Sequence, residues 1–158
     1  LVNAGYYAIN CLRLEKGYRA FGPELNPDYN PVEAGLMFAV KLKTDIPFVG
    51  RACVEQAKAQ GVRRRLVSFA LADPDVMMWG GELLLRDGEG TGQVTSAAFG
   101  TTVGSCVGLA YVWRPDGDIV MNEYLQSGQW SINVNGAAMP ATVQLGPLYD
   151  PRSERIRS

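Results

Sequence analysis

The sequence of 158 residues contains no histidine. Catalysis of the Ser-His-Asp or Cys-His type is therefore excluded within this chain, because both mechanisms use an imidazole as the base. Histidine metal ligands are excluded with it. Cysteine is also scarce, since Cys11, Cys53 and Cys106 lie far apart and form no CxxC pair. This pattern favours reduced, mostly buried thiols in a cytoplasmic (bacterial) or mitochondrial-matrix protein over a disulfide or a zinc site.

Long apolar runs, a signal peptide and an excess of charge are also lacking. No run approaches the roughly 20 apolar residues that span a bilayer, and the net charge of −1 gives no reason to expect a nucleic-acid or membrane partner. No GxGxxG motif follows a strand and no GxxxxGK(S/T) loop occurs, so a nucleotide or flavin site is not expected in this chain. The chain starts at Leu1 rather than Met and enters a helical pattern almost at once. We therefore expect it to be the C-terminal part of a larger protein.

The periodicity of the apolar residues changes along the chain. Helices are predicted over 4–16, with Asn3 as N-cap, and over 51–60, with a strand over 36–42 between them. Short strands are predicted over 66–70, 82–86, 92–98, 107–113, 119–124, 130–134 and 141–145, and Asn135-Gly136 predicts a two-residue hairpin turn. Seven short strands imply a barrel or a sandwich. We expect a division into 1–61, an all-β unit over 62–150, and a polar tail over 151–158.

Three segments carry candidate functional residues. Glu15 ends the first helix, about 80° around its axis from Tyr7. It is either a solvated carboxylate or a hydrogen-bond acceptor for a heterocycle at the edge of a pocket. Glu33 enters the predicted strand from a loop, which fits a ligand wall or a buried turn. The third segment, Asp73 to Gly81, holds two methionines and Trp79, which form a satellite core or line a ligand or partner surface.

Two basic clusters have ordinary explanations. Residues 63–65 are three arginines that fit a solvated edge or ion pairs between domains. Three further arginines in the tail (Arg152, Arg155 and Arg157) are exposed by default, or else reach an acidic ligand such as a polyglutamate.

Residues 7–22, which read YAINCLRLEKGYRAFG, resemble the Leu-Arg-Leu-Glu-(Lys/Ala)-Gly segment of the glycine-cleavage T-protein family. The resemblance continues in order through residues 30–36 (NPVEAGL), 48–51 (FVGR), 63–67 (RRRLV), 92–96 (GQVTS) and 108–112 (GLAYV). The Lys16-Gly17-Tyr18-Arg19 variant is more similar to sarcosine and dimethylglycine dehydrogenases. T-proteins have Ala-Arg-Asp where this chain has Ala8-Ile9-Asn10, which also favours the dehydrogenase branch.

The resemblance implies an α+β fold, in which the remnant of an α/β folate-binding domain is followed by an antiparallel Greek-key β-barrel. Such dehydrogenases oxidise an N-methyl amine in an N-terminal flavin domain that binds FAD, and pass the one-carbon unit to tetrahydrofolate in the C-terminal region. The flavin domain of the same parent chain is thus the implied partner. The family's catalytic aspartate lies upstream, so no catalytic residue is expected here. The folate-binding residues that the resemblance implies are Tyr7, Leu14, Glu15, Lys16, Asp75 and Trp79.

Three functions therefore remain open at the level of the sequence. The first is the folate-side fragment of a flavin-dependent sarcosine- or dimethylglycine-type dehydrogenase. The second is a structural barrel module that binds no ligand of its own. The third is a T-protein-like aminomethyltransferase without flavin.

Overall fold

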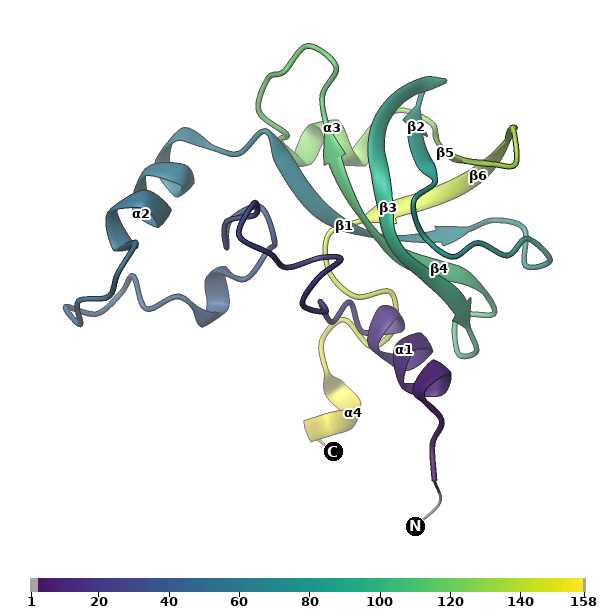
Figure 1. Cartoon of the computed structure of the whole chain (residues 1–158), viewed down its shortest axis with the longest axis horizontal. Coiled ribbons are helices and arrows are strands. Elements are labelled where there is room, and N and C mark those ends of the chain that lie inside the picture. Colours follow the sequence, from purple (N-terminus) through teal and green to yellow (C-terminus); the bar gives the residue numbers. More distant parts are fainter. Residues whose placement is uncertain (1–2, 158) are drawn as a thin grey trace.

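The structure, a computed structural model that describes residues 3–157, is built around a closed barrel of antiparallel strands (Figure 1). The strands are β1 (Arg64–Leu71), β2 (Leu83–Arg86), β3 (Glu89–Gly100), β4 (Ser105–Trp113), β5 (Trp130–Val134) and β6 (Ala137–Gln144). Their order around the barrel is β1-β4-β3-β2-β5-β6, with β6 closing on β1. Consecutive strands β2, β3 and β4 are neighbours and β1 returns beside β4, which is a Greek key. The expected antiparallel Greek-key barrel is confirmed.

Two tight turns set the strand register. Asn135 and Gly136 have φ angles of 52° and 88°, and Asp87 and Gly88 have 53° and 85°. Positive φ at both central residues matches the right-handed twist of the paired strands. The hairpin predicted at Asn135-Gly136 is confirmed, and it joins β5 to β6.

The strand β4 is buried on both faces. Cys106 and Ala110 face the barrel interior, here called the main core, whereas Val107 and Tyr111 face a second cluster on the outside of the barrel, the outer core. A strand covered on both faces reads as a continuous apolar run, as this one does. The side chains of the main core come from all six strands and from the chain crossing the barrel end; they include Val67, Phe69, Met78, Leu84, Val94, Val112, Val120, Leu125 and Ile132.

The helix α1 (Tyr6–Glu15) covers the outer core. Leu14 is fully buried against Leu66, Leu109 and Tyr111, and the helix lies against β3 and β4. The predicted helix is confirmed, but it begins at Tyr6 after Gly5, so the predicted N-cap at Asn3 is wrong.

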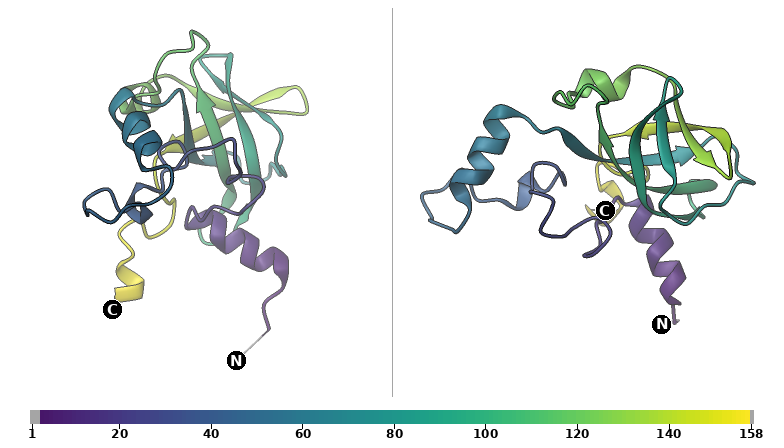
Figure 2. Two further views of the ribbon diagram at one scale, coloured as in Figure 1. Left: turned by 60° about the vertical axis from the view of Figure 1, so that its left-hand side comes forward. Right: turned by 45° about the horizontal axis from the view of Figure 1, so that its top comes forward.

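An arm, residues 37–60, stands away from the barrel, and the chain continues from it into the start of β1 (Figures 1 and 2). It contains the short 3₁₀ helix η1 (Met37–Ala39) and the helix α2 (Arg51–Gln60), which agrees with the helix predicted over 51–60. The strand predicted over 36–42 is wrong. A strand needs a neighbour for its backbone N–H and C=O groups, and the closed barrel leaves no free edge to supply one.

The strand predicted over 119–124 is also wrong. This stretch lies in the connection that crosses the end of the barrel from β4 to β5, and the connection contains α3 (Asn122–Gln126). The connection places Val120 and Leu125 in the main core, and Trp130 Nε1 donates a hydrogen bond of 3.3 Å to the carbonyl of Leu125. Every edge that a seventh strand would need is already paired, so the connection closes the barrel end instead.

The polar tail contains the short helix α4 (Glu154–Arg157). Over residues 3–157 no helix has the length and apolar character required to cross a membrane. Nor do these residues contain three or more cysteine, aspartate and glutamate side chains grouped so as to hold a metal ion. The proposed division of the chain at residue 62 stays a prediction.

Candidate functional site on the barrel face that carries α1

The segment from α1 to Gly35 is held on the barrel by three buried carboxylates. The first is Glu24, which is fully buried. Its Oε2 accepts hydrogen bonds from Arg13 Nη1 at 2.9 Å and from the N–H of Ala20 at 2.8 Å. Its Oε1 accepts from the hydroxyls of Thr95 at 2.8 Å and Ser96 at 2.6 Å, where β3 carries a bulge. Because a buried charge needs both an ion pair and hydrogen bonds, this arrangement ties the loop after α1 firmly to β3.

Glu15 is the second buried carboxylate. Its Oε1 accepts hydrogen bonds from the backbone N–H groups of Thr102 at 2.6 Å and Val103 at 3.0 Å. These two residues form the turn between β3 and β4, so the end of α1 is joined to the tip of that hairpin. No hydrogen bond to the other oxygen, Oε2, is present among the described residues. One oxygen of Glu15 therefore serves the fold, and the residue as a whole is only 1% accessible.

Glu33 is the third, and it connects the same segment to the start of β1. Its Oε1 accepts from Arg64 Nε at 3.2 Å, and its Oε2 accepts from the N–H of Asn30 at 3.0 Å. The Arg64 guanidinium also lies 4.9 Å from the ring centroid of Tyr29, which stacks on Tyr111 with 3.9 Å between ring centroids. Of the two interpretations of Glu33, the geometry matches the buried turn.

Tyr111 joins this stack to the Glu24 cluster. Its hydroxyl donates a hydrogen bond of 2.9 Å to the backbone carbonyl of Glu24. Burial raises the pKa of the Tyr111 hydroxyl well above its ordinary value, with the neighbouring Tyr29 adding to the effect. The hydroxyl therefore stays protonated at neutral pH and acts as a donor to that carbonyl.

Of the six residues expected to bind folate, Leu14, Glu15 and Lys16 lie at the inner end of α1. Leu14 is in the outer core and Glu15 is bonded to the β3–β4 turn. Lys16 Nζ donates to the backbone carbonyl of Asp150 at 2.8 Å and forms an ion pair with its carboxylate at 3.3 Å. These three residues therefore connect α1 to the barrel and to the C-terminal segment.

The other three expected residues are exposed. Tyr7 lies in the first turn of α1 with 73% of its surface accessible, and its ring meets that of Tyr6 edge-on. Trp79 is 74% accessible, and its N–H donates to Glu82 Oε1 at 3.0 Å. Asp75 is exposed in the same loop. No hydrogen bond or ring contact joins Tyr7, Asp75, Trp79 and Glu15 to one another among residues 3–157, and their folate-binding role stays a prediction.

The loop from Asp73 to Gly81 divides between the two interpretations given to it. Met78 is buried in the main core, which fits a satellite of the core, whereas Met77 and Trp79 remain exposed. Cavities of 650, 530 and 350 Å³ are present elsewhere on the molecule, and none of them is lined by the six expected folate residues. Within the described chain Tyr7, Asp75 and Trp79 therefore form open surface, whereas Leu14 and Glu15 are buried.

The exposed part of α1 is apolar. Ile9 and Leu12, on the side opposite Leu14, are each 55% accessible. Tyr6 and Tyr7 in the first turn are largely accessible as well. Tyr7 lies on the same side of the helix as Leu14, seven residues earlier, but the N-terminal end of α1 projects beyond the barrel (Figures 1 and 2) and only the end with Leu14 packs on it. Exposed apolar side chains gathered in this way are typical of a surface that contacts another protein segment or a ligand.

Glu24 is the residue that sequence reasoning missed. It lies between Pro23 and Leu25 in a loop rich in turn residues, where an acidic side chain is normally solvated. Its partners Thr95 and Ser96 are about seventy residues away in the sequence, at separations of 71 and 72. No local pattern indicates such a contact.

Known proteins share both parts of this architecture. The family model described as the glycine cleavage T-protein C-terminal barrel domain matches residues 64–150, and the GCVT N-terminal domain matches residues 1–44. Mitochondrial sarcosine dehydrogenase of Mus musculus is 40% identical over 157 residues, which cover 99% of this chain and 17% of that protein. Mitochondrial dimethylglycine dehydrogenase of Homo sapiens is 37% identical over 157 residues, 98% of this chain and 17% of that protein.

A solved structure has the same fold. The glycine cleavage system aminomethyltransferase T from Bartonella henselae superposes with a TM-score of 0.76 at 23% identity, over 91% of this chain and 38% of that one. The chain spans only 17% of the length of the two dehydrogenases. The match to the barrel model covers more than half of the residues, and the resemblance expected from the motifs is confirmed. The chain belongs to the glycine cleavage T-protein C-terminal barrel domain family.

Proposed function

We propose that this chain is the folate-side part of a flavin-dependent N-methyl amine dehydrogenase of the sarcosine or dimethylglycine type, which passes a one-carbon unit to tetrahydrofolate. Identity of 40% to sarcosine dehydrogenase over nearly the whole chain supports this assignment. So does the order of the two matched family models along the chain. The parent protein would then supply the FAD domain and the catalytic aspartate upstream of this chain.

The observation that carries the proposal is that α1 is anchored at one end and exposed at the other. Its C-terminal end is fixed to the barrel through Leu14 and Glu15, and the following loop through Glu24. Its first turn projects beyond the barrel (Figures 1 and 2) and presents Tyr6 and Tyr7 to the surroundings. A rigid scaffold that presents aromatic rings is suited to hold a flat heterocycle such as the pterin of folate.

The six expected residues take distinct roles in this proposal. Tyr7 and Trp79 would contact the ligand directly with their exposed rings, and Asp75 would border it from the same loop as Trp79. Leu14 and Lys16 would hold α1 in place. The second oxygen of Glu15, which has no hydrogen-bond partner in the described chain, is the acceptor that would take a pterin N–H.

The proposed partner of this chain is the rest of its parent protein, and the proposed compartment is that of the related dehydrogenases. The exposed apolar face of α1 would pack on the upstream folate-binding and flavin regions, which complete the cleft. The related sarcosine and dimethylglycine dehydrogenases are mitochondrial, which favours the mitochondrial matrix over the bacterial cytoplasm.

Thermal unfolding in the presence of tetrahydrofolate tests the proposal. A ligand that binds only the folded protein raises the midpoint by mass action, in proportion to the logarithm of its concentration once it exceeds its dissociation constant. We expect such a rise for the full-length parent and a smaller one for this chain, which carries one wall of the cleft. Absence of any rise in the parent would contradict folate binding.

A structural barrel module is the second candidate. It is favoured by the finding that the cavities of 650, 530 and 350 Å³ are lined by none of the expected folate residues. A rise in midpoint for the parent, together with no effect of substituting Tyr7 or Trp79 on folate affinity, would favour this module. A flavin motif in the upstream sequence would separate the dehydrogenase from a T-protein-like aminomethyltransferase.

A further inference from the structure

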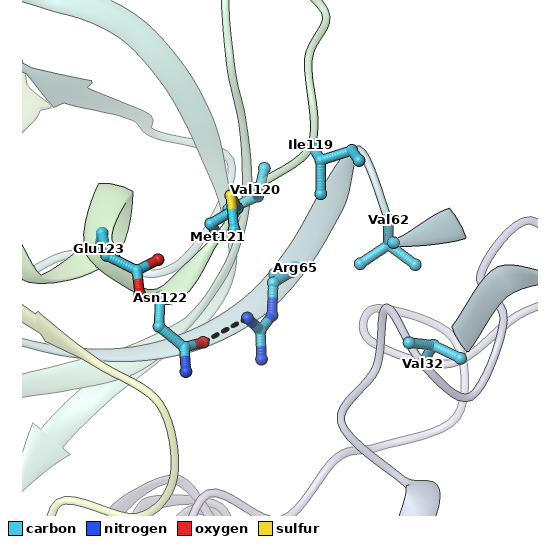
Figure 3. Close-up of a pocket in the computed structure, with 9 residues that line it drawn as sticks. Val32, Val62, Arg65, Ile119, Val120, Met121, Asn122 and Glu123 are labelled. Atoms are coloured by element: carbon cyan, nitrogen blue, oxygen red, sulfur yellow. Dashed lines mark hydrogen bonds between the residues drawn. The ribbon is translucent and has the colours of Figure 1, made fainter. Parts of the chain in front are cut away.

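A cavity of 350 Å³ lies at the end of the barrel, where the arm joins β1 and the α3 crossing covers the opening (Figure 3). Its walls are mainly apolar and include Val62, Ile119, Val120 and Met121. Figure 3 shows Arg65 between the α3 residues on one side and Val62 and Val32 on the other. The volume falls at the lower end of the range of small-molecule sites, about 300–1,000 Å³.

Strand geometry explains why a cation lies in this cavity. Side chains alternate along β1, and Val67 and Phe69 face the main core. Arg65 is on the same face, two residues before Val67 at the start of the strand. Its side chain therefore lies at the end of the barrel, where it lines the cavity. Arg64 points to the opposite face, where it pairs with Glu33. Among residues 3–157, Arg65 forms no ion pair with a carboxylate.

The burial of Arg65 is poorly compensated. Its Nη1 donates a hydrogen bond of 2.6 Å to Asn122 Oδ1, a neutral acceptor. Desolvation lowers the pKa of its guanidinium. Arg19 is also half-buried, but it donates to two backbone carbonyls, those of Gly17 and Ala34. Arg65 therefore has fewer hydrogen-bond acceptors than Arg19, although both guanidinium groups are partly buried.

The hydrogen bond to Asn122 leaves the other edge of the guanidinium unused. Nε and Nη2 have no acceptor among the described residues, and these two donors form the parallel pair that binds both oxygens of a carboxylate. Glu123 lines the same cavity, but it is exposed and lies beyond ion-pair distance of Arg65 in the described structure. Its negative charge disfavours an anion with more than one charge.

We propose that this cavity is a binding site for a small monocarboxylate with a compact apolar body. The carboxylate lies against Nε and Nη2 of Arg65, and the apolar body contacts Val62, Ile119 and Val120. The site is independent of the proposed folate function, because it shares no residue with the proposed folate wall.

Titration of this chain with benzoate, followed by amide NMR or calorimetry, tests the site, with benzyl alcohol as the uncharged probe of similar shape. We expect benzoate to bind and to shift the resonances of Arg65 and Asn122, and benzyl alcohol to bind at least tenfold more weakly, because it cannot accept the charge-assisted pair of hydrogen bonds. Equal affinities for the two probes would overturn the proposal.

Three variants sharpen the test. Arg65→Gln is expected to weaken benzoate binding about tenfold or more. Arg63→Gln removes the same charge from an exposed side chain without a hydrogen bond or ion pair in the described structure, and is expected to change it less than about twofold. Glu123→Gln removes the nearby like charge and is expected to strengthen binding. Equal losses in Arg65→Gln and Arg63→Gln would overturn the proposal.

The Glu123 variant keeps the test decisive if Arg65→Gln does not fold, because it leaves the barrel residues unchanged and predicts a gain of affinity rather than a loss. Weaker or unchanged binding in Glu123→Gln would count against the site. So would loss of benzoate binding in a longer protein that contains this chain, since an acidic side chain of that protein would then occupy the cavity.

Discussion

Replacement of Glu24 by alanine is expected to be among the most damaging single changes in this protein. The substitution removes the acceptor of four hydrogen bonds, including those from Arg13 at 2.9 Å and Ser96 at 2.6 Å. It leaves Arg13 without its ionic partner, and the Arg13 side chain is only 15% accessible. Breaking a buried pair on one side costs about 3–5 kcal/mol, because the remaining charge is left uncompensated.

Glu24→Gln separates the charge from the hydrogen bonds. The amide can turn its carbonyl towards Arg13 and the N–H of Ala20, and its NH₂ group towards the hydroxyls of Thr95 and Ser96, which can accept hydrogen bonds. The loss is then confined to the charge assistance of the bond from Arg13, about 1–2 kcal/mol. We therefore expect Glu24→Ala to destabilise the protein considerably more than Glu24→Gln.

Urea unfolding measures the loss of unfolding free energy in both variants, and thermal unfolding measures the corresponding fall in melting temperature. A domain of this size has a stability of about 5–15 kcal/mol, and each kcal/mol lowers the melting temperature by about 2–4 °C. We expect Glu24→Ala to lower it by about 6–20 °C. Hydrogen exchange of the Ala20 amide should also accelerate in this variant, because its acceptor is Glu24 Oε2.

Glu55→Ala is the matched control. Glu55 pairs with Arg51 at 2.9 Å within α2, but its side chain is 49% accessible, and an exposed pair of this kind contributes about 0.3–0.5 kcal/mol. If Glu24→Ala costs no more than Glu55→Ala, the carboxylate does not hold the segment after α1 on the barrel, and the reasoning from burial is wrong.

Three further changes test particular contacts. Tyr111→Phe removes the hydrogen bond to the Glu24 carbonyl and should destabilise the protein by about 1–3 kcal/mol, measured by urea unfolding, because a buried carbonyl loses its donor; no loss would contradict that bond. Gly108→Ala should reduce the melting temperature strongly, since its Cβ would lie 2.2 Å from a backbone oxygen of β3; an unchanged melting temperature would contradict this close approach. Iodoacetamide should label the exposed Cys53 rapidly and Cys106 only on unfolding, since Cys106 is fully buried and burial raises the pKa of its thiol; equal labelling rates would contradict this.

The strands and turns of the barrel were predictable because their signals are local. Asn135-Gly136 needs only two residues to define a turn, and the run Cys106 to Val112 identifies a strand covered on both faces. The two wrong strands, over 36–42 and 119–124, have apolar residues suited to strands as well. What decides their structure is the lack of an unpaired edge in a closed barrel, which depends on all six strands at once.

The site was less predictable for the same reason. The LRLEKG motif indicated the end of α1 as a candidate site, but sequence spacing could not indicate that Glu15 bonds the turn at Thr102 and Val103. The role of Glu24 depends on hydroxyls contributed by a distant bulge in β3. Long-range contacts of this kind leave no periodicity in the sequence. The exposure of Tyr7 likewise follows from how far α1 extends beyond the barrel (Figure 1), since Tyr7 shares the side of the helix that carries the buried Leu14.

The central claim is that this chain supplies one wall of a folate site in a dehydrogenase whose amine chemistry lies elsewhere. The direct test is tetrahydrofolate affinity and the rate of flavin reduction by amine in the full-length protein, with Tyr7→Ala compared against Phe38→Ala, an exposed aromatic on the arm. We expect about two- to tenfold weaker folate binding in Tyr7→Ala alone, from a lost ring contact, with flavin reduction unchanged in both. Unaltered folate binding in Tyr7→Ala, or slower flavin reduction in parallel, would contradict the central claim.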